Sequence, residues 1–283
     1  MLTALASLLW LPLLACLILS FIHGYLGLHV LAREVIFVDI ALAQVAALGA
    51  TAAFLFGYDL DSVLAYWISL GFTLVGAAIL AGTRTREQHV SQEAVIGVVY
   101  AVSAAAAILL LDRAPHGVEH IKAMLVGSLL TVTPMQVAKT AMLYGVVGLF
   151  HWWARWPFIL ISTDPAAAYA RGIAVRWWDF LFYASFGVVV TSSVRIAGVL
   201  LVFAYLIVPG LAGMAWRAQW RARLLFGWSL ATGVSLAGIV LSASLDLPTG
   251  ATIVCIFGLT LVVTWIVAAW KRLAQARPND WHG

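Results

Sequence analysis

Three polar side chains, Asp39, Gln44 and Thr51, interrupt the otherwise apolar stretch 35–57. Their carboxylate, amide and hydroxyl oxygens can coordinate a cation or hydrogen-bond a polar solute. Gln44 and Thr51 are seven residues apart and would share one face of a helix. Because polar and ionisable residues inside membrane-spanning helices often mark transport routes, we expect these three residues to line a translocation pathway.

Each of the three residues also has a structural alternative. For Asp39 the alternative is a position at the edge of the membrane or an ion pair with Arg33. For Gln44 and Thr51 it is a hydrogen bond to a neighbouring helix.

Residues 116–120 read HGVEH and fit the pattern HxxEH, in which two imidazoles on a helix bind zinc beside a catalytic Glu. Gly117 disfavours a rigid helix here, and no motif for a third ligand is recognisable, so a zinc enzyme is not expected. His116, Glu119 and His120 remain candidate metal ligands, in a loop that would attract or receive cations. The alternative is a solvated loop with no metal.

Residues 164–172 read DPAAAYARG, the pattern of a short capped helix. Asp164 suits the N-cap, Pro165 suits the first helical position, and Gly172 suits the end of the helix. Such a helix is either a connector on the membrane surface or a docking element for a partner subunit. The candidate docking residues are Asp164, Pro165, Tyr169, Arg171 and Gly172.

The composition indicates where these segments lie. Of the 283 residues, 64% are hydrophobic and 10% are charged, whereas soluble domains carry about 25% charged residues. A helix crosses a bilayer with about 20 apolar residues, so we predict an all-α, polytopic transmembrane bundle of about eight or nine spans that forms one domain over residues 1–283. The nine candidate spans cover residues 5–28, 35–57, 63–82, 93–111, 125–150, 177–194, 196–215, 224–243 and 250–270. Pro134 is expected to interrupt the fifth span, with residues 127–133 as a half-helix or re-entrant segment.

The charged residues orient the predicted bundle. Most of the 16 Lys and Arg residues lie in loops on one side, which the positive-inside rule assigns to the cytoplasm. This side contains segment 164–172 and the C-terminus, and the N-terminus is predicted to lie outside. The basic residues form no continuous patch, so the net charge of +4 does not indicate nucleic-acid binding.

Four stretches resemble, in order and spacing, the permeases of metal-uptake ABC transporters, which import manganese, zinc or iron. They are residues 93–99 (EAVIGVV), 164–173 (DPAAAYARGI), 195–209 (RIAGVLLVFAYLIVP) and 246–252 (DLPTGAT). The resemblance covers nearly the whole chain. It implies the fold of a type II-like ABC importer permease, with many passes through the cytoplasmic (inner) membrane.

The resemblance also implies partners. It points to a homodimer in membrane lipid, a cytoplasmic ATP-binding subunit, and an extracytoplasmic solute-binding protein that delivers the ion. Segment 164–172 would be the coupling helix that docks the ATP-binding subunit. The chain has no GxxxxGK[ST] motif, so ATP hydrolysis is expected on the separate subunit and this chain is not expected to be an enzyme. No tightly bound cofactor is expected, and a divalent metal would be the transported substrate.

The second span departs from the family pattern. The family places an Asp and, four residues later, a His on this helix as cation ligands. Aligned on residues 41–44, these positions hold Ile40 and Gln44 here. Asp39 is adjacent, but one residue turns a helix by about 100°, so Asp39 cannot replace Ile40 in the same register. Since amide and hydroxyl oxygens bind zinc or manganese weakly, we expect weak cargo binding or a cargo other than a bare transition-metal ion.

A second class of function fits the composition equally well. A stand-alone secondary transporter or channel would also be an apolar helical bundle. The two hypotheses differ in partner dependence, because only the permease requires an ATP-binding subunit.

Overall fold

A computed structural model describes residues 2–59, 62–84, 91–111, 127 and 129–275. This part of the chain is built from helices and contains no strand. The elements are α1 (Leu2–Ala32), α2 (Val38–Leu55), α3 (Val63–Gly82), α4 (Gln92–Leu111), η1 (Leu129–Thr131), α6 (Pro134–Trp153), α7 (Arg155–Thr163), α8 (Pro165–Ala170), α9 (Val175–Trp216), α10 (Trp220–Leu245) and α11 (Thr249–Gln275).

Seven of the described helices are long and apolar enough to cross a membrane: α1, α2, α3, α4, α9, α10 and α11. The 42-residue α9 covers both the sixth and the seventh predicted spans, and α6 covers most of the fifth. The predicted all-α, multi-pass fold is therefore confirmed. The sixth and seventh predicted spans are the two helical segments of α9, which meet at a non-helical residue, Gly198.

The kink in α9 lies at Gly198, where φ is 76° and ψ is 160°. This left-handed conformation is readily adopted only by glycine. A Cβ atom on Gly127 would lie 2.3 Å from the backbone carbonyl carbon of Ala197, so the chain before α6 packs directly against the kink. The predicted half-helix in this region is the single 3₁₀ turn η1.

The helix α6 begins later than expected. Thr133 and Gln136 form a capping box, in which the Thr133 hydroxyl accepts from the backbone of Gln136 and the Gln136 side chain accepts from the backbone of Thr133. Pro134 follows in the first turn, where its missing N–H costs no hydrogen bond. Pro134 therefore starts a helix and does not interrupt one, which corrects the predicted fifth span.

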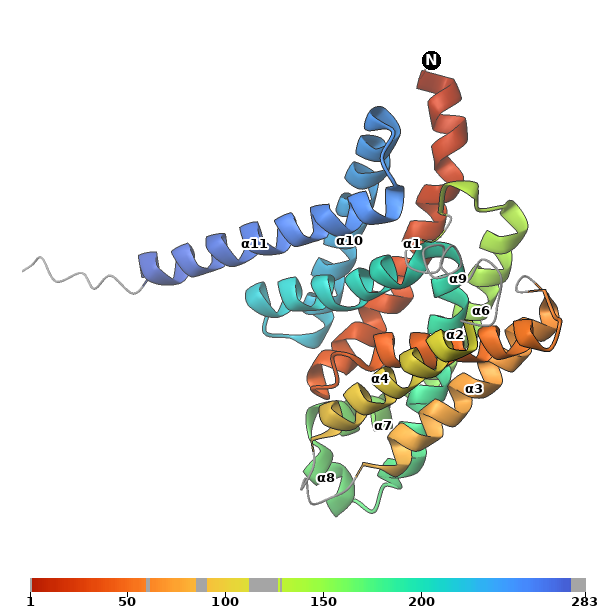
Figure 1. Cartoon of the computed structure of the whole chain (residues 1–283). Coiled ribbons are helices and arrows are strands. Elements are labelled where there is room, and N and C mark those ends of the chain that lie inside the picture. Colours follow the sequence, from red (N-terminus) through yellow and green to blue (C-terminus); the bar gives the residue numbers. More distant parts are fainter. Residues whose placement is uncertain (1, 60–61, 85–90, 112–126, 128, 276–283) are drawn as a thin grey trace, which may run out of the picture.

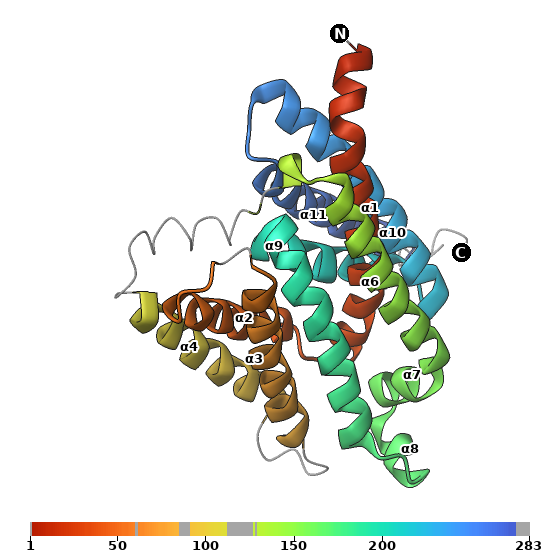
Figure 2. The same ribbon diagram turned by 90° about the vertical axis from the view of Figure 1, so that its right-hand side faces the viewer.

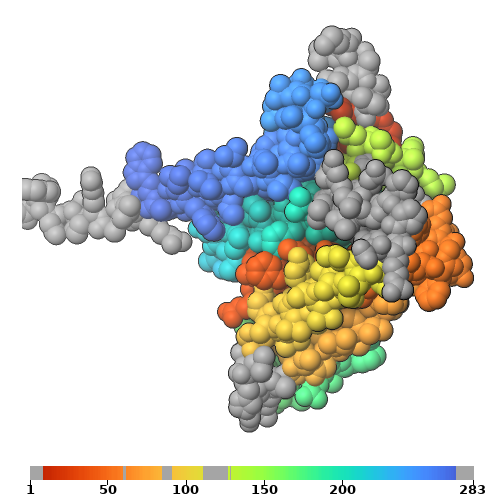
Figure 3. All heavy atoms as spheres, viewed as in Figure 1, coloured from red at the N-terminus to blue at the C-terminus, as the bar shows by residue number. Residues whose placement is uncertain are grey.

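The helix α9 is the centre of the packing and contacts α1, α2, α3, α10 and α11. Figure 2 shows α2, α3 and α4 grouped on one side of α9 and α1, α6 and α10 on the other. Large buried side chains of α9 fill the core between them, including Phe182, Tyr183, Phe186 and Tyr205. The helix α4 lies on the surface (Figure 3), and most of its apolar side chains are exposed, as expected for a lipid-facing helix.

The short helices α7 and α8 lie together at one end of the molecule, opposite the N-terminus (Figures 1 and 2). The same end holds Arg33, Arg84 and Arg176, and the Arg176 side chain donates a hydrogen bond to the carbonyl oxygen of Arg84. We call it the α8 end. It gathers basic residues that the charge distribution assigns to the cytoplasm.

Candidate functional site

One face of the first half of α2 is partly exposed. Ile40, Gln44 and Leu48 are partly exposed there, and Phe37, which directly precedes the helix, is exposed. These residues recur every three or four positions and so form a single stripe. We call these four residues the open stripe. It contains both positions at which the predicted metal ligands are missing, Ile40 and Gln44, and its one polar group is the Gln44 amide.

Asp39 does not share this face. Its side chain is 1% exposed, and neither carboxylate oxygen has a hydrogen-bond partner among the described residues. The alternative of an ion pair between Asp39 and Arg33 is wrong, because Arg33 pairs with Asp179. The Asp39 side chain is turned into the interior of the bundle, and its position relative to the membrane edge stays a prediction.

Thr51 is likewise buried, at 1% exposure, while Gln44 is partly exposed. Both lie on the same side of α2 by helical periodicity. Their exposure nevertheless differs. Of the three predicted pathway residues, only Gln44 lies on the open stripe.

A buried polar cluster occupies the α8 end. The Arg33 Nε donates to Ser162 Oγ at 2.8 Å, and Arg33 Nη1 donates to Asp179 Oδ1 at 2.6 Å. Arg84 Nη1 lies 2.8 Å from Asp179 Oδ2, and His29 Nδ1 lies 2.9 Å from Ser162 Oγ. We call these five residues the Arg33 cluster. It joins the ends of α1 and α3 to α7 and the start of α9.

The importance of Asp179 is not evident from its immediate sequence context. The only signal is that it is a lone carboxylate at the start of the predicted sixth span. In the structure its side chain is fully buried and lies between two guanidinium groups. An unpaired buried carboxylate is costly, so a lone Asp in such a position predicts a basic partner, but the partner cannot be identified without the fold.

The predicted capped helix is present as α8. Asp164 is its N-cap, and Asp164 Oδ1 accepts from the backbone N–H of Ala167 at 2.9 Å. Gly172 has a φ of 71°, which ends the helix. Only Ala168 of α8 is buried, and Asp164, Arg171 and Gly172 are exposed. The helix therefore presents one side, with Ala166 and Ala170, and both of its ends outward.

Three buried histidines lie inside the bundle, and each contacts a serine hydroxyl. His23 Nε2 lies 3.1 Å from Ser193 Oγ, and His151 Nε2 lies 2.8 Å from Ser185 Oγ. His29 contacts Ser162 in the Arg33 cluster. Within the described residues no group of three or more His, Cys, Asp or Glu side chains could hold a metal ion. The contacts of the three histidines link α1 to α9, α6 to α9 and α1 to α7.

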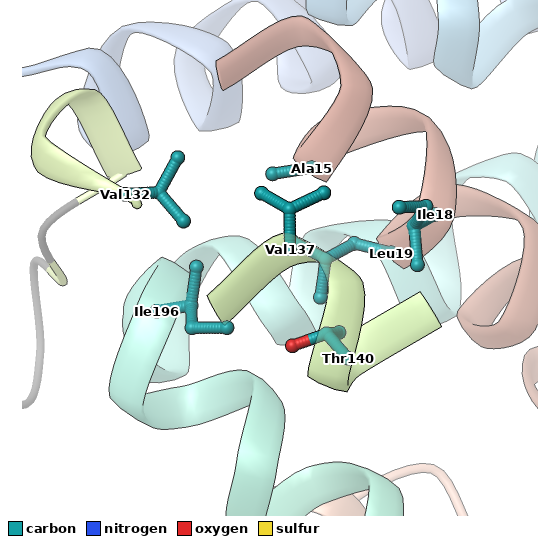
Figure 4. Close-up of a pocket in the computed structure, with 7 residues that line it drawn as sticks. All are labelled: Ala15, Ile18, Leu19, Val132, Val137, Thr140 and Ile196. Atoms are coloured by element: carbon teal, nitrogen blue, oxygen red, sulfur yellow. The ribbon is translucent and has the colours of Figure 1, made fainter. Parts of the chain in front are cut away.

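The remaining candidates are the three predicted ligands in segment 116–120 and one small described pocket. His116, Glu119 and His120 lie outside the described residues. A small pocket between α1, α6 and α9 is lined by Ala15, Ile18, Leu19, Val132, Val137, Thr140 and Ile196 (Figure 4). Its one polar lining side chain is Thr140, and a single neutral hydroxyl is a poor ligand for a divalent ion.

Comparison with known proteins places this arrangement in context. A family model described as the ABC 3 transport family matches residues 6–268. The chain is 22% identical to a probable iron transport system membrane protein of Haemophilus influenzae, over 86% of this chain and 87% of that one. It is 24% identical to the manganese transport system membrane protein MntC of Halalkalibacterium halodurans, over 86% and 81% of the two chains.

A solved structure has the same fold. The structure titled "PsaBC from Streptococcus pneumoniae in complex with Fab" matches with a TM-score of 0.77 and 18% identity, covering 94% of this chain and 95% of that chain.

Proposed function

The chain belongs to the ABC 3 transport family, and on that premise we propose that it is the permease through which an ATP-driven importer moves a divalent metal ion or a metal-related solute. The observation that carries this proposal is the family match over residues 6–268. Relatives named for iron and manganese transport support a metal cargo. They favour an importer subunit over a stand-alone transporter or channel.

We infer that α8 docks the ATP-binding subunit in the cytoplasm. The chain contains no phosphate-binding loop of its own, so the energy of ATP hydrolysis must reach it through a contact. The exposed residues of α8 include Ala166 and Ala170, and such small side chains allow the backbone of the helix to approach a groove closely. The N-cap at Asp164 makes this short helix more rigid than a simple loop.

The cargo is inferred to pass along the open stripe of α2. Gln44 is the polar group available there, and a neutral amide holds zinc or manganese less tightly than a carboxylate or an imidazole. Weak binding favours release. A metal ion that keeps ligands of its own would also need fewer ligands from the protein.

The open stripe of α2 also supports a homodimer. If the open stripe faced lipid, an ion passing along it would lose its hydration without replacement, at a high cost in free energy. A second copy of the chain that covers the stripe would close the pathway. An extracytoplasmic solute-binding protein would deliver the cargo at the end opposite α8.

Uptake measurements test this function. The permease is reconstituted in vesicles with its ATP-binding subunit and solute-binding protein, and the uptake of manganese, zinc and iron is measured with and without ATP. We expect uptake of at least one metal that requires both ATP and the ATP-binding subunit. Uptake by the purified chain alone would reject the importer, and ATP-dependent complexes that move none of these metals would reject the metal cargo.

A further inference from the structure

Two residues of the Arg33 cluster lie on either side of α8 in the sequence. Ser162 lies two residues before the N-cap of α8, and Asp179 lies shortly after α8 at the start of α9. A single guanidinium group at the end of α1 donates to both of these side chains. The two flanks of α8 are therefore held by one residue from another part of the chain.

The Ser162 hydroxyl takes part in three hydrogen bonds. Its hydroxyl donates to the carbonyl oxygen of Phe158 at 2.8 Å, so its oxygen accepts from Arg33 Nε. Because the only hydroxyl proton is used, His29 Nδ1 must be the donor in the third contact. Two side chains near the end of α1, His29 and Arg33, thus bind the same atom just before α8.

The packing of α8 itself is separate from the main core. Its buried residue Ala168 packs in a small apolar cluster with Ile161 and Val175. These residues belong to α7, α8 and α9, and none belongs to α1, α2 or α3. The polar contacts of Arg33 with Ser162 and Asp179, and of Arg84 with Asp179, therefore connect the α8 segment with the ends of α1 and α3.

From this geometry we propose that Arg33 is a positioning residue that transmits the movement of α8 to the transmembrane helices α1 and α3. The proposal rests on the proposed function, in which α8 docks the ATP-binding subunit. A planar guanidinium can donate two bonds in fixed directions, whereas a lysine ammonium cannot reproduce that fork. The Arg33 and Asp179 side chains are both fully buried, so solvent and salt do not weaken their ion pair as they would a surface pair.

The test separates coupling from folding. The permease is reconstituted with its ATP-binding subunit and solute-binding protein, and three quantities are measured: the bound ATP-binding subunit, ATP hydrolysis, and the metal taken up per ATP. For Arg33→Lys we expect binding and hydrolysis to persist while uptake per ATP falls about tenfold, the size of effect expected from one lost hydrogen bond to a charged group. For Ser162→Ala, which keeps the ion pair, we expect a smaller fall in the same quantity.

Two variants serve as controls. Arg155→Lys changes an exposed arginine in the same region that donates to the carbonyl oxygen of Trp152 and lies outside the Arg33 cluster. Ser242→Ala removes a buried hydroxyl that donates to Leu247 at the far end of α10. Both are expected to keep wild-type uptake per ATP, even if the Ser242 variant is less stable.

The outcomes are distinct. If Arg33→Lys and Ser162→Ala change only the yield of assembled complex and keep wild-type uptake per ATP, the cluster is merely structural and the proposal is wrong. If Arg33→Lys does not assemble, Ser162→Ala decides by the same ratio. If the wild-type chain binds no ATP-binding subunit and moves no metal, the proposed function fails, and this proposal fails with it.

Discussion

At the scale of single residues, the most informative position is Gln44. It lies where the family resemblance leads one to expect a histidine ligand, on a stripe whose other members are Phe37, Ile40 and Leu48. This position therefore holds a neutral polar group in place of a strong metal ligand. A neutral amide would bind a metal ion weakly and so would allow its release during transport.

Replacing this amide tests its role in transport. We expect Gln44→Ala to lower metal uptake by at most about tenfold, because a single hydrogen bond contributes about 1 kcal/mol. Leu48→Ala, one turn further along the same stripe, is the matched control and should change uptake much less. Equal uptake rates for Gln44→Ala and the wild type would show that the amide does not contact the cargo.

A second residue-scale prediction concerns the close approach of α1 and α9. A Cβ atom on Gly27 would lie 1.8 Å from the carbonyl oxygen of Leu206, so the two helices cannot keep their spacing if a methyl group is added. We expect Gly27→Ala to destabilise the protein by at least about 1–3 kcal/mol, the usual cost of overpacking. The measurement is thermal unfolding in detergent. Gly71→Ala is the control, because nothing lies within 4 Å of the added methyl, and similar melting temperatures for the two variants would contradict this packing.

At the scale of elements, α8 combines local stability with outward exposure. Asp164 provides its N-cap, Pro165 its first position and Gly172 its end, so residues within the helix itself specify where it begins and stops. Its boundaries are thus specified locally, while a helix of only six residues needs packing such as that of Ala168 to be stable. Its placement at the α8 end, beside the Arg33 cluster, depends on α7 and α9.

The N-cap of α8 is predicted to be needed for partner binding. Asp164→Ala removes the hydrogen bond to Ala167 and should cost about 1 kcal/mol of local helix stability. We expect less ATP-binding subunit to co-purify with this variant. Thr133→Ala is the matched control, because it removes an N-cap of the same kind from α6 and should leave co-purification unchanged. An equal loss in both variants would point to general instability instead of docking.

At the scale of the whole molecule, a multi-pass bundle encloses its own core but leaves the open stripe of α2 partly exposed. The kink at Gly198 divides α9 into two halves. The first half contacts α3 through Thr191 and Thr73, and the second contacts α10 through Tyr205 and Ser235. An ion pathway along α2 therefore requires an additional wall, which a second copy of the chain would supply.

Cross-linking tests this dimer. In a Cys255→Ser background, which removes the exposed native thiol, we expect Leu48→Cys to form a covalent dimer in membranes when treated with a short thiol-specific cross-linker. Met142→Cys on α6 is the control, because this side chain is 74% exposed and should face lipid. A dimer that forms through Met142→Cys and not through Leu48→Cys would place the interface elsewhere.

The amino-acid sequence by itself determined the all-α, multi-pass class and the local helix α8. Both depend on properties that are local in the chain: the length of apolar runs and the identity of capping residues. Only the tertiary structure decided the partner of Arg33, which is Asp179, 146 residues away, instead of the neighbouring Asp39. It also decided that Asp39 and Thr51 are buried while Gln44 is partly exposed. The exposure of a side chain depends on which distant helices cover it, and helical periodicity contains no information about those neighbours.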